Sequence, residues 1–169
     1  SKMKERFLGE YYGVADVRNV SVITNGTSKQ KEVVCEGEDK REKYCLPKEC
    51  KIVLVIGSLC ERKNQSQVVK AIELIPREQR KKLCVFFLGR DMTDGLIQRE
   101  IEKSGTEDTI KVIGFVPQTE LSSYYEQADL NIVASIDEGF GLSIIEGFIH
   151  GVPTLCFSDL DAVDDLYDE

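Results

Sequence analysis

The sequence contains very little histidine, and its cysteines are not arranged in pairs. His150 is the single histidine of the 169 residues, and none of the six cysteines belongs to a Cys-x-x-Cys motif. Structural zinc sites need several cysteine or histidine ligands, and disulfide frameworks need regularly spaced cysteines. We therefore expect no metal site and no disulfide framework. Cys60, Cys84 and Cys156 lie in or beside apolar runs, so we expect them to pack as small buried hydrophobic side chains.

Positive charge and long apolar runs are also scarce. The sequence has 22 Lys and Arg against 30 Asp and Glu, which gives a formal net charge of −8. This balance provides no general attraction for nucleic acid or for an anionic membrane, so an anionic ligand must be held by local groups. No apolar run approaches the roughly 18 residues of a spanning helix, and residues 1–4 show no signal-peptide core. We expect a cytoplasmic chain with no nucleic-acid partner and no membrane span.

Two common nucleotide-binding motifs are missing as well. The sequence has no Gly-Lys-Ser/Thr phosphate loop. Gly139 and Gly141 begin a Gly-x-Gly pattern, but Ile144 stands where the dinucleotide fingerprint has its third glycine. A nucleoside triphosphatase and an NAD-dependent enzyme are therefore both disfavoured.

From residue 50 onward, short apolar runs alternate with longer amphipathic stretches. This alternation is typical of successive βαβ units, and continuously apolar strands are covered on both faces. The sequence therefore predicts an α/β fold with a Rossmann-like, doubly wound parallel sheet. The expected strands are 52–56, 83–88, 110–113, 130–133 and 152–157, and the clearest helical patterns span 68–75, 96–101 and 121–128.

The first 49 residues differ from the rest. Residues 29–51 are dense in charge and are broken by Gly37 and Pro47, while residues 20–26 read as a short strand entering an Asn-Gly turn. We interpret residues 1–49 as an interdomain linker remnant and edge element, and residues 50–169 as the Rossmann-like domain. The acidic end that begins at Asp159 is expected to lie in solvent.

The most informative segment follows the strand at 130–133 and opens a helix. Gly139 and Gly141 allow the backbone to approach a ligand closely, and the free N–H groups of the helix start favour a phosphate or polarised hydroxyl without a metal. The helix beyond is apolar almost all round, so we expect it to be buried, with Glu146 carried into the interior. Glu138 and Glu146 should face the strand ends, where carboxylates can accept hydrogen bonds from sugar diols. The alternative is that Glu146 pairs with a buried Lys or Arg and that the glycines only make the turn.

Two further loops are weaker candidates. After Gly57, Arg62 and Lys63 stand where they could neutralise a diphosphate, or they form a solvated basic pair before a helix. Residues 114–116 form a post-strand loop that could flank a base, or an ordinary turn. His150 precedes a Gly and a Pro, which favours a helix-capping role over catalysis.

Taken together, these segments resemble the nucleotide-sugar-binding, carboxyl-terminal domain of GT-B glycosyltransferases, in the large retaining group 1 family of capsule and lipopolysaccharide sugar transferases. Residues 138–146 are similar to that family's paired-glutamate motif, with seven residues between the two glutamates around a Gly-Phe-Gly-Leu turn. Similar supporting segments occur in family order from about Val20 to the end of the chain. They are Asn25-Gly26, Arg62–Gln65, Phe87–Gly89, Val112–Val116 and Tyr125–Asp129. The resemblance implies one half of a GT-B fold.

The resemblance also implies roles for individual residues. Lys63 would neutralise the donor diphosphate, Glu138 would contact the donor sugar, and Glu146 would bind the ribose hydroxyls. Stabilisation of the leaving group by Lys63 and the helix start would be the main catalytic contribution. The donor would be a UDP- or GDP-linked sugar, with no further cofactor. The remaining implied contacts are Gly139, Phe140, Gly141 and Leu142 to sugar and phosphate, Gly57, Ser58 and Arg62 to the diphosphate, and Gly114, Phe115 and Val116 to the base.

The sequence departs from this family in two places. The family usually has Arg after the first glycine, where this chain has Ser58, so one phosphate contact is absent or comes from Arg62. The Gly-x-Gly common after the second strand reads Gly89-Arg90-Asp91, which alters that edge of the pocket. The chain also resembles a piece that begins in the interdomain linker and stops before the closing helix, so we expect it to be inactive alone.

The expected function is donor binding for retaining, metal-independent glycosyl transfer in polysaccharide or glycolipid biosynthesis. An acceptor glycan or lipid-linked sugar would bind through an amino-terminal domain, and the full-length enzyme could sit at the inner face of the membrane. Two alternatives remain open. One is a GT-B-type sugar-nucleotide epimerase, and the other is a Rossmann-like interaction module that has lost the chemistry.

Overall fold

The computed structural model describes residues 38–160 and contains a five-stranded sheet. The strand order is β3-β2-β1-β4-β5, and every neighbouring pair is parallel. The five predicted strands are therefore confirmed, although the last is shorter than expected. They are β1 (Lys51–Ile56), β2 (Leu83–Leu88), β3 (Ile110–Gly114), β4 (Leu130–Val133) and β5 (Thr154–Cys156).

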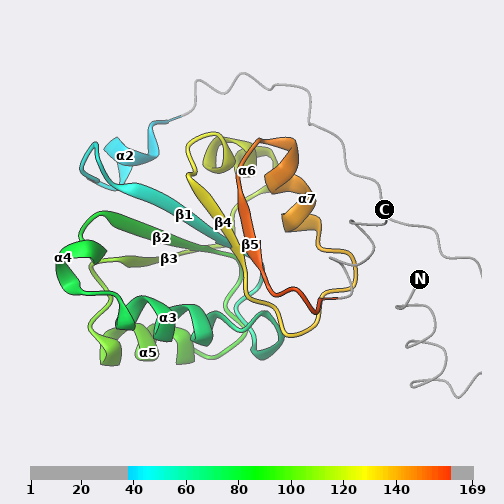
Figure 1. Cartoon of the computed structure of the whole chain (residues 1–169), viewed down its shortest axis with the longest axis horizontal. Coiled ribbons are helices and arrows are strands. Elements are labelled where there is room, and N and C mark those ends of the chain that lie inside the picture. Colours follow the sequence, from blue (N-terminus) through cyan, green and yellow to red (C-terminus); the bar gives the residue numbers. More distant parts are fainter. Residues whose placement is uncertain (1–37, 161–169) are drawn as a thin grey trace, which may run out of the picture.

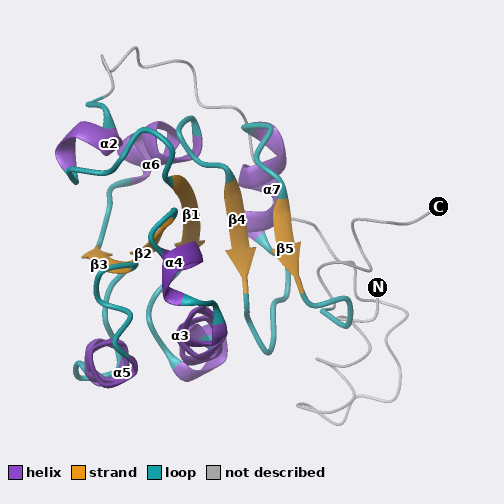
Figure 2. Ribbon diagram, turned by 60° about the vertical axis from the view of Figure 1, so that its left-hand side comes forward, coloured by secondary structure: helices purple, strands orange, loops and turns teal. Residues whose placement is uncertain are grey.

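Helices cover both faces of this sheet, which confirms the doubly wound, Rossmann-like architecture. Helices α3 and α5 lie on one face, and α2, α6 and α7 lie on the other (Figures 1 and 2). The three predicted helices correspond to α3, α5 and α6. The helical elements are α2 (Lys40–Lys43), the 3-10 turn η2 (Glu61–Lys63), α3 (Gln65–Leu74), α4 (Arg77–Arg80), α5 (Leu96–Ser104), α6 (Gln118–Tyr125) and α7 (Leu142–Ile149).

The alternation of side chains along β1 explains why its sequence is apolar throughout. Val53 and Val55 pack under α3 and α5, whereas Ile52 and Leu54 pack under α6. All four side chains are buried. Because both faces of the central strands are covered, a run of consecutive apolar residues is stable there.

Residues 38–49 precede the first strand and pack against the sheet. They form α2 and a turn that packs on the sheet, where the Tyr44 ring lies 4.8 Å from that of Phe86 and its hydroxyl lies 2.9 Å from that of Tyr124. Within the described residues this segment contains a helix and no strand, and the domain boundary at residue 50 stays a prediction. The predicted strand at 20–26 and the acidic residues from Asp161 lie outside the described residues, and the linker remains a prediction for residues 1–37.

Helix α7 is less buried than its sequence predicts. Ser143, Ile144 and Gly147 face the sheet and are buried, but Leu142 is 45% exposed and Phe148 is 47% exposed. The helix lies over β4 and β5 at the side of the sheet (Figure 2), and the described residues leave part of its surface uncovered. The expectation of a helix buried all round is therefore wrong.

The cysteines follow the prediction in part. Cys84 is buried, and burial raises the pKa of its thiol to about 12. Cys60 and Cys156 are only half-buried, since they lie at the ends of the apolar runs. Each cysteine within residues 38–160 is a free thiol.

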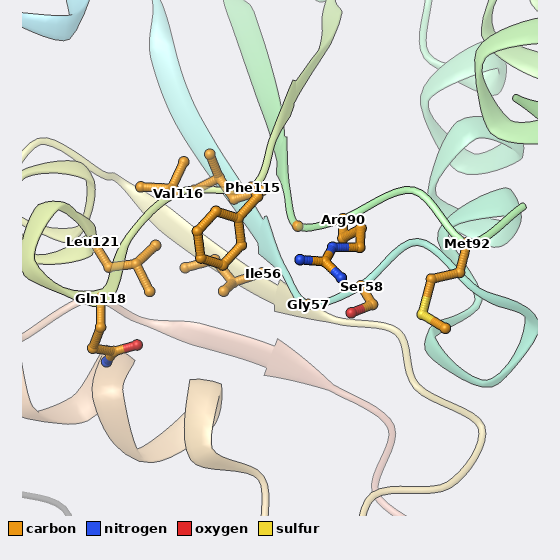
Figure 3. A pocket seen from close by; sticks show the side chains of 11 residues that line it. Ile56, Gly57, Ser58, Arg90, Met92, Phe115, Val116, Gln118 and Leu121 are labelled. Atoms are coloured by element: carbon orange, nitrogen blue, oxygen red, sulfur yellow. The ribbon is translucent and has the colours of Figure 1, made fainter.

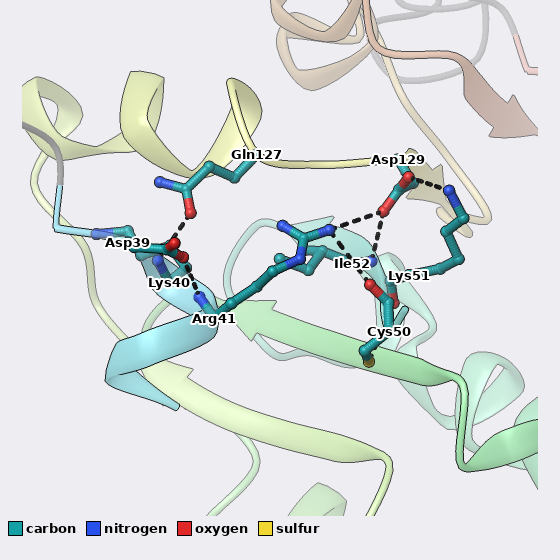
Figure 4. A network of polar contacts seen from close by, with 8 residues as sticks. All are labelled: Asp39, Lys40, Arg41, Cys50, Lys51, Ile52, Gln127 and Asp129. Atoms are coloured by element: carbon teal, nitrogen blue, oxygen red, sulfur yellow. Dashed lines mark hydrogen bonds and ion pairs between the residues drawn. The ribbon is translucent and has the colours of Figure 1, made fainter. Parts of the chain in front are cut away.

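A polar network anchors α2 and β1 at the amino-terminal edge of the sheet (Figure 4). Asp129 lies at its centre, where one carboxylate oxygen accepts a hydrogen bond from the N–H of Ile52 at 2.8 Å and the other pairs with Lys51 at 2.8 Å. The Arg41 guanidinium lies 3.6 Å from the same carboxylate. Burial opposes ionisation here, but the Lys51 ion pair and the Ile52 hydrogen bond outweigh it, so the pKa of Asp129 is lowered.

We expect Asp129→Ala to lower the free energy of unfolding at pH 7 by about 2 kcal/mol, because the N–H of Ile52 loses its acceptor. A carboxylate with a lowered folded pKa stabilises the fold above its unfolded pKa of about 4, and this contribution disappears as the pH falls through the folded value. Urea denaturation at pH 7 and at pH 2.5 should therefore show a smaller difference between wild type and variant at the acid pH. An equal difference at both values would contradict the role of the charge.

Candidate functional site

The order of the strands places one candidate site at the carboxyl-terminal edge of the sheet. The chain turns from β1 toward β2 and β3 on one side, and β4 and β5 lie on the other side of β1. Ligands of open α/β sheets bind at such a switch point, outside the carboxyl ends of the strands. The segments that follow β1, β3 and β4 contain all the predicted site residues except Gly114, which ends β3, and Leu142 and Glu146, which are in α7.

A pocket of about 380 Å³ opens at this edge (Figure 3). Its volume lies within the range of small-molecule sites. Of the predicted residues, Gly57, Ser58, Phe115 and Val116 line it, while Gly114 ends β3 immediately before. The other lining residues are Ile56, Leu88, Gly89, Arg90, Met92, Gln118 and Leu121.

The loops after β1 and β2 are held together by backbone hydrogen bonds beyond the ends of the strands. The N–H of Gly57 donates to Leu88 at 2.9 Å, and the N–H of Leu59 donates to Arg90 at 2.9 Å. The carbonyl of Leu59 then accepts from Met92 at 3.0 Å. The side chain of the buried Gln65 also donates to the carbonyl of Ser58 at 3.1 Å. This wall of the pocket is therefore fixed by the backbone.

Lys63 and Glu138 form an ion pair next to the pocket. The Lys63 ammonium donates a hydrogen bond to the Glu138 carboxylate, and the two side chains are 15% and 12% exposed. The same carboxylate oxygen accepts from the Ser135 hydroxyl at 3.1 Å. The Lys63 side chain passes over Gly57, since a Cβ added at residue 57 would lie 3.2 Å from the Lys63 Cε. The loops after β1 and β4 thus bring the two predicted catalytic residues together beside a pocket-lining glycine.

Arg62 holds the loop after β4. Its guanidinium donates to the carbonyl of Asp137 at 2.9 Å and lies 3.8 Å from the Glu138 carboxylate. Its own carbonyl accepts from the N–H of Ile136 at 2.9 Å. Arg62 does not line the pocket. The structure therefore does not place it where it could replace the family's phosphate-binding Arg, whose position is taken by Ser58.

The amino end of α7 follows this loop. Gly139 and Phe140 lead to Gly141, which caps the helix with a φ of 69°, a conformation that glycine adopts without strain. Within residues 38–160, the N–H groups of Leu142 and Ser143 donate to no acceptor. They are two of the free donors that make a helix start favourable for an anion or a polarised hydroxyl.

Glu146 lies in the middle of α7, on the side that faces α6. Its carboxylate accepts hydrogen bonds from Gln118 at 2.8 Å and from the Tyr125 hydroxyl at 3.1 Å. Burial raises the pKa of Tyr125, and the negative charge of Glu146 raises it further. Glu146 is half-buried, and its partners within residues 38–160 are Gln118 and Tyr125, with no Lys or Arg of this range in an ion pair with it.

His150 ends α7 as its C-cap residue, which agrees with the predicted position at a helix terminus. Its ring stacks on that of Tyr125, with the centroids 5.1 Å apart and the planes 3° apart. His150 is therefore a packing partner of the tyrosine that contacts Glu146.

Three residues at this edge are not identified by the sequence analysis as site residues: Arg90, Gln118 and Tyr125. Gln118 both lines the pocket and donates to Glu146, so it connects the pocket with α7. Arg90 directly follows a glycine at the end of β2, which is the same signal that draws attention to Gly57 and Gly114. Tyr125 belongs to the helical pattern and to the family-like segment Tyr125–Asp129, but neither of these assigns it a role in the site.

A family model places this architecture among known proteins. The model described as "Glycosyl transferases group 1" matches residues 21–165. The chain belongs to this family. Among curated relatives, the O-antigen chain mannosyltransferase B of Escherichia coli is 34% identical over 104 residues, which cover 61% of this chain and 27% of that enzyme.

Two solved glycosyltransferase structures share the GT-B-type, Rossmann-like fold of this family member. WaaG, a glycosyltransferase involved in lipopolysaccharide biosynthesis, has a TM-score of 0.66 at 21% identity, over 74% of this chain and 34% of its own. HepE of Anabaena in complex with UDP and glucose has a TM-score of 0.65 at 18% identity, over 76% of this chain and 35% of its own. The chain thus spans about a quarter to a third of these relatives.

Two structural features are absent from residues 38–160. None of their helices is both long enough and apolar enough to cross a membrane. No group of three or more His, Cys, Asp or Glu side chains in this range is arranged to hold a metal ion.

Proposed function

We propose that this chain is the donor-binding, carboxyl-terminal domain of a retaining glycosyltransferase of the paired-glutamate type. One observation carries the proposal: a single pocket at the sheet edge adjoins both glutamates. Lys63, the partner of Glu138, crosses the pocket-lining Gly57, and the pocket-lining Gln118 donates to Glu146. The amino end of α7 lies between the two glutamates in sequence.

The chemistry of the lining fits a nucleotide sugar. Phe115 and Val116 offer an apolar contact for a base. Glu146 can accept hydrogen bonds from the ribose diol, and Glu138 can accept them from the donor sugar. The Lys63 ammonium and the free N–H groups at the start of α7 are the groups that can balance the charge of the diphosphate.

In the transfer, the bond between the anomeric carbon of the sugar and the terminal phosphate oxygen breaks. The acceptor hydroxyl bonds to that carbon, and its proton passes to the departing phosphate oxygen. Negative charge develops on the departing nucleoside diphosphate. Lys63 and the α7 amino end stabilise this charge, which is the kind of preorganised electrostatic contribution that dominates many enzymes. We propose that the positive charge comes from these groups, so that the reaction is independent of a metal and of a further cofactor.

The relatives support a role in polysaccharide or glycolipid biosynthesis. WaaG is involved in lipopolysaccharide biosynthesis, and the structure of HepE holds UDP and glucose. We propose a UDP- or GDP-linked donor, an acceptor glycan or lipid-linked sugar that binds to another domain, a cytoplasmic location and no transfer activity in this chain alone. The comparisons match glycosyltransferases, which favours this proposal over a sugar-nucleotide epimerase or an interaction module.

Isothermal titration calorimetry with UDP, GDP and ADP tests the proposal. At least one of the three should bind the full chain, and Glu146→Ala should weaken that nucleotide by about 10-fold, because the ribose loses a charged hydrogen-bond acceptor. Glu107→Ala is the matched control, since Glu107 is exposed and lies before β3, away from the pocket. Absence of binding by the wild type, or equal weakening by both variants, would overturn the proposal.

A further inference from the structure

Arg90 gives the pocket a positive charge that no acid within residues 38–160 balances. It is the one charged residue among the described residues that line the pocket. Its side chain is exposed and makes no hydrogen bond or ion pair within the described part of the chain. In a chain with a formal net charge of −8, an unpaired guanidinium in a pocket provides a local binding position for an anionic group.

The nearest acid in the sequence is directed elsewhere. The carboxylate of Asp91 accepts hydrogen bonds from the N–H of Thr93 at 2.8 Å, from the Thr93 hydroxyl at 2.6 Å and from the N–H of Gly95 at 3.0 Å. Asp91 therefore closes its own turn before α5. It leaves the neighbouring guanidinium available to a ligand.

The other basic side chains of this edge are already paired. Lys63 donates to Glu138, and Arg62 contacts both the carbonyl of Asp137 and Glu138. An incoming diphosphate has to compete with Glu138 for these two groups. Arg90 has no such competitor, so it is the cation that can engage a phosphate first.

The position of Arg90 is fixed by the backbone that carries it. Its carbonyl accepts from the N–H of Leu59 at 2.9 Å, and the preceding Gly89 lies against the backbone of Gly57. Figure 3 shows the guanidinium extending into the pocket toward Ser58. The loops after β1 and β2 thus place a five-donor group beside the small side chain of residue 58.

We propose that Arg90 binds the diphosphate of the donor nucleotide in this pocket and so makes the pocket select nucleoside diphosphates over nucleosides. The proposal rests on the proposed function. Phe115 and Val116 receive the apolar base, and Arg90 receives phosphate oxygens from the wall formed by the β1 and β2 loops. A planar guanidinium can donate two parallel hydrogen bonds to a phosphate, which a lysine at the same place cannot.

The test compares the affinities of UDP and uridine by calorimetry at constant ionic strength. Arg90→Ala should lower the affinity for UDP by about 10- to 30-fold and that for uridine by less than about 2-fold, because a hydrogen bond to a charged group is lost only with UDP. Arg90→Lys should give an intermediate loss for UDP. Arg77→Ala is the matched control, since Arg77 is 76% exposed and lies before β2, at the opposite edge of the sheet.

The outcomes separate this proposal from the one on which it rests. If the wild type binds UDP and Arg90→Ala binds it equally well, the role of Arg90 is wrong while the proposed function stands. Equal losses of affinity for UDP and for uridine would also overturn it, because Arg90 would then support the shape of the pocket without contacting the phosphates. If the wild type binds none of UDP, GDP or ADP, both proposals fail. Thermal melting should show unchanged folding of Arg90→Ala, because the side chain is exposed and unpaired.

Discussion

Gly89→Ala is expected to lower the free energy of unfolding by about 3 kcal/mol or more and to close the pocket. A Cβ at residue 89 would lie 2.1 Å from the carbonyl oxygen of Gly57 and 2.9 Å from the backbone nitrogen of Ser58. Overpacking usually costs about 1–3 kcal/mol when side chains can shift, and here the obstacle is backbone. The loops after β1 and β2 must separate, which breaks the hydrogen bonds that define this wall.

Gly105→Ala is the matched control for that prediction. Gly105 has a φ of 63°, and a Cβ there would meet nothing within 4 Å. Gly105→Ala should therefore lower the free energy of unfolding only by the cost of placing alanine in the left-handed conformation, about 1 kcal/mol. Urea denaturation should rank the two variants clearly, and nucleotide affinity should fall only for Gly89→Ala. Equal destabilisation by both variants would show that the contact with Gly57 does not matter.

The parts of the fold that the sequence predicts are those governed by local pattern. The runs at 52–56 and 83–88 are apolar because both faces of a central strand are covered, and Gly57 and Gly89 end them where the chain leaves the sheet. The same logic brings Gly114 and the segment before α7 to one edge, since parallel strands share the direction in which they end. Most candidate site residues follow from this rule alone.

The errors arise where the answer depends on contacts between distant segments. The burial of α7 depends on its place over β4 and β5, which its own apolar residues do not reveal. Residues 38–49 read as a charged linker, yet Tyr44 meets Phe86 and Tyr124 from other elements. Lys63 and Glu138 are 75 residues apart, so neither segment by itself indicates that the two side chains pair.

The ion pair of Lys63 and Glu138 leads to the largest expected effect on binding. Lys63→Met should weaken UDP binding by about 100-fold, because the site loses a cation and Glu138 keeps only the longer contact with Arg62. The same variant should lower the free energy of unfolding by about 2 kcal/mol, less than for a fully buried pair, since both side chains are partly exposed. Glu138→Gln instead removes the carboxylate that competes with the phosphate for Lys63, so it should raise the affinity for UDP by about 3- to 10-fold.

The double variant, Lys63→Met with Glu138→Gln, separates the two consequences. Removing both charges eliminates the carboxylate that has lost Lys63, so the stability of the double variant should return toward that of the wild type, with a coupling energy of about 1–2 kcal/mol. UDP affinity should remain low, because the ammonium that balances the diphosphate is still missing. Recovery of affinity together with stability would mean that Lys63 acts only by holding Glu138 and the loop after β4. Low affinity in a stable double variant would instead show that donor binding exchanges one anionic partner of Lys63, the carboxylate, for another, the phosphate.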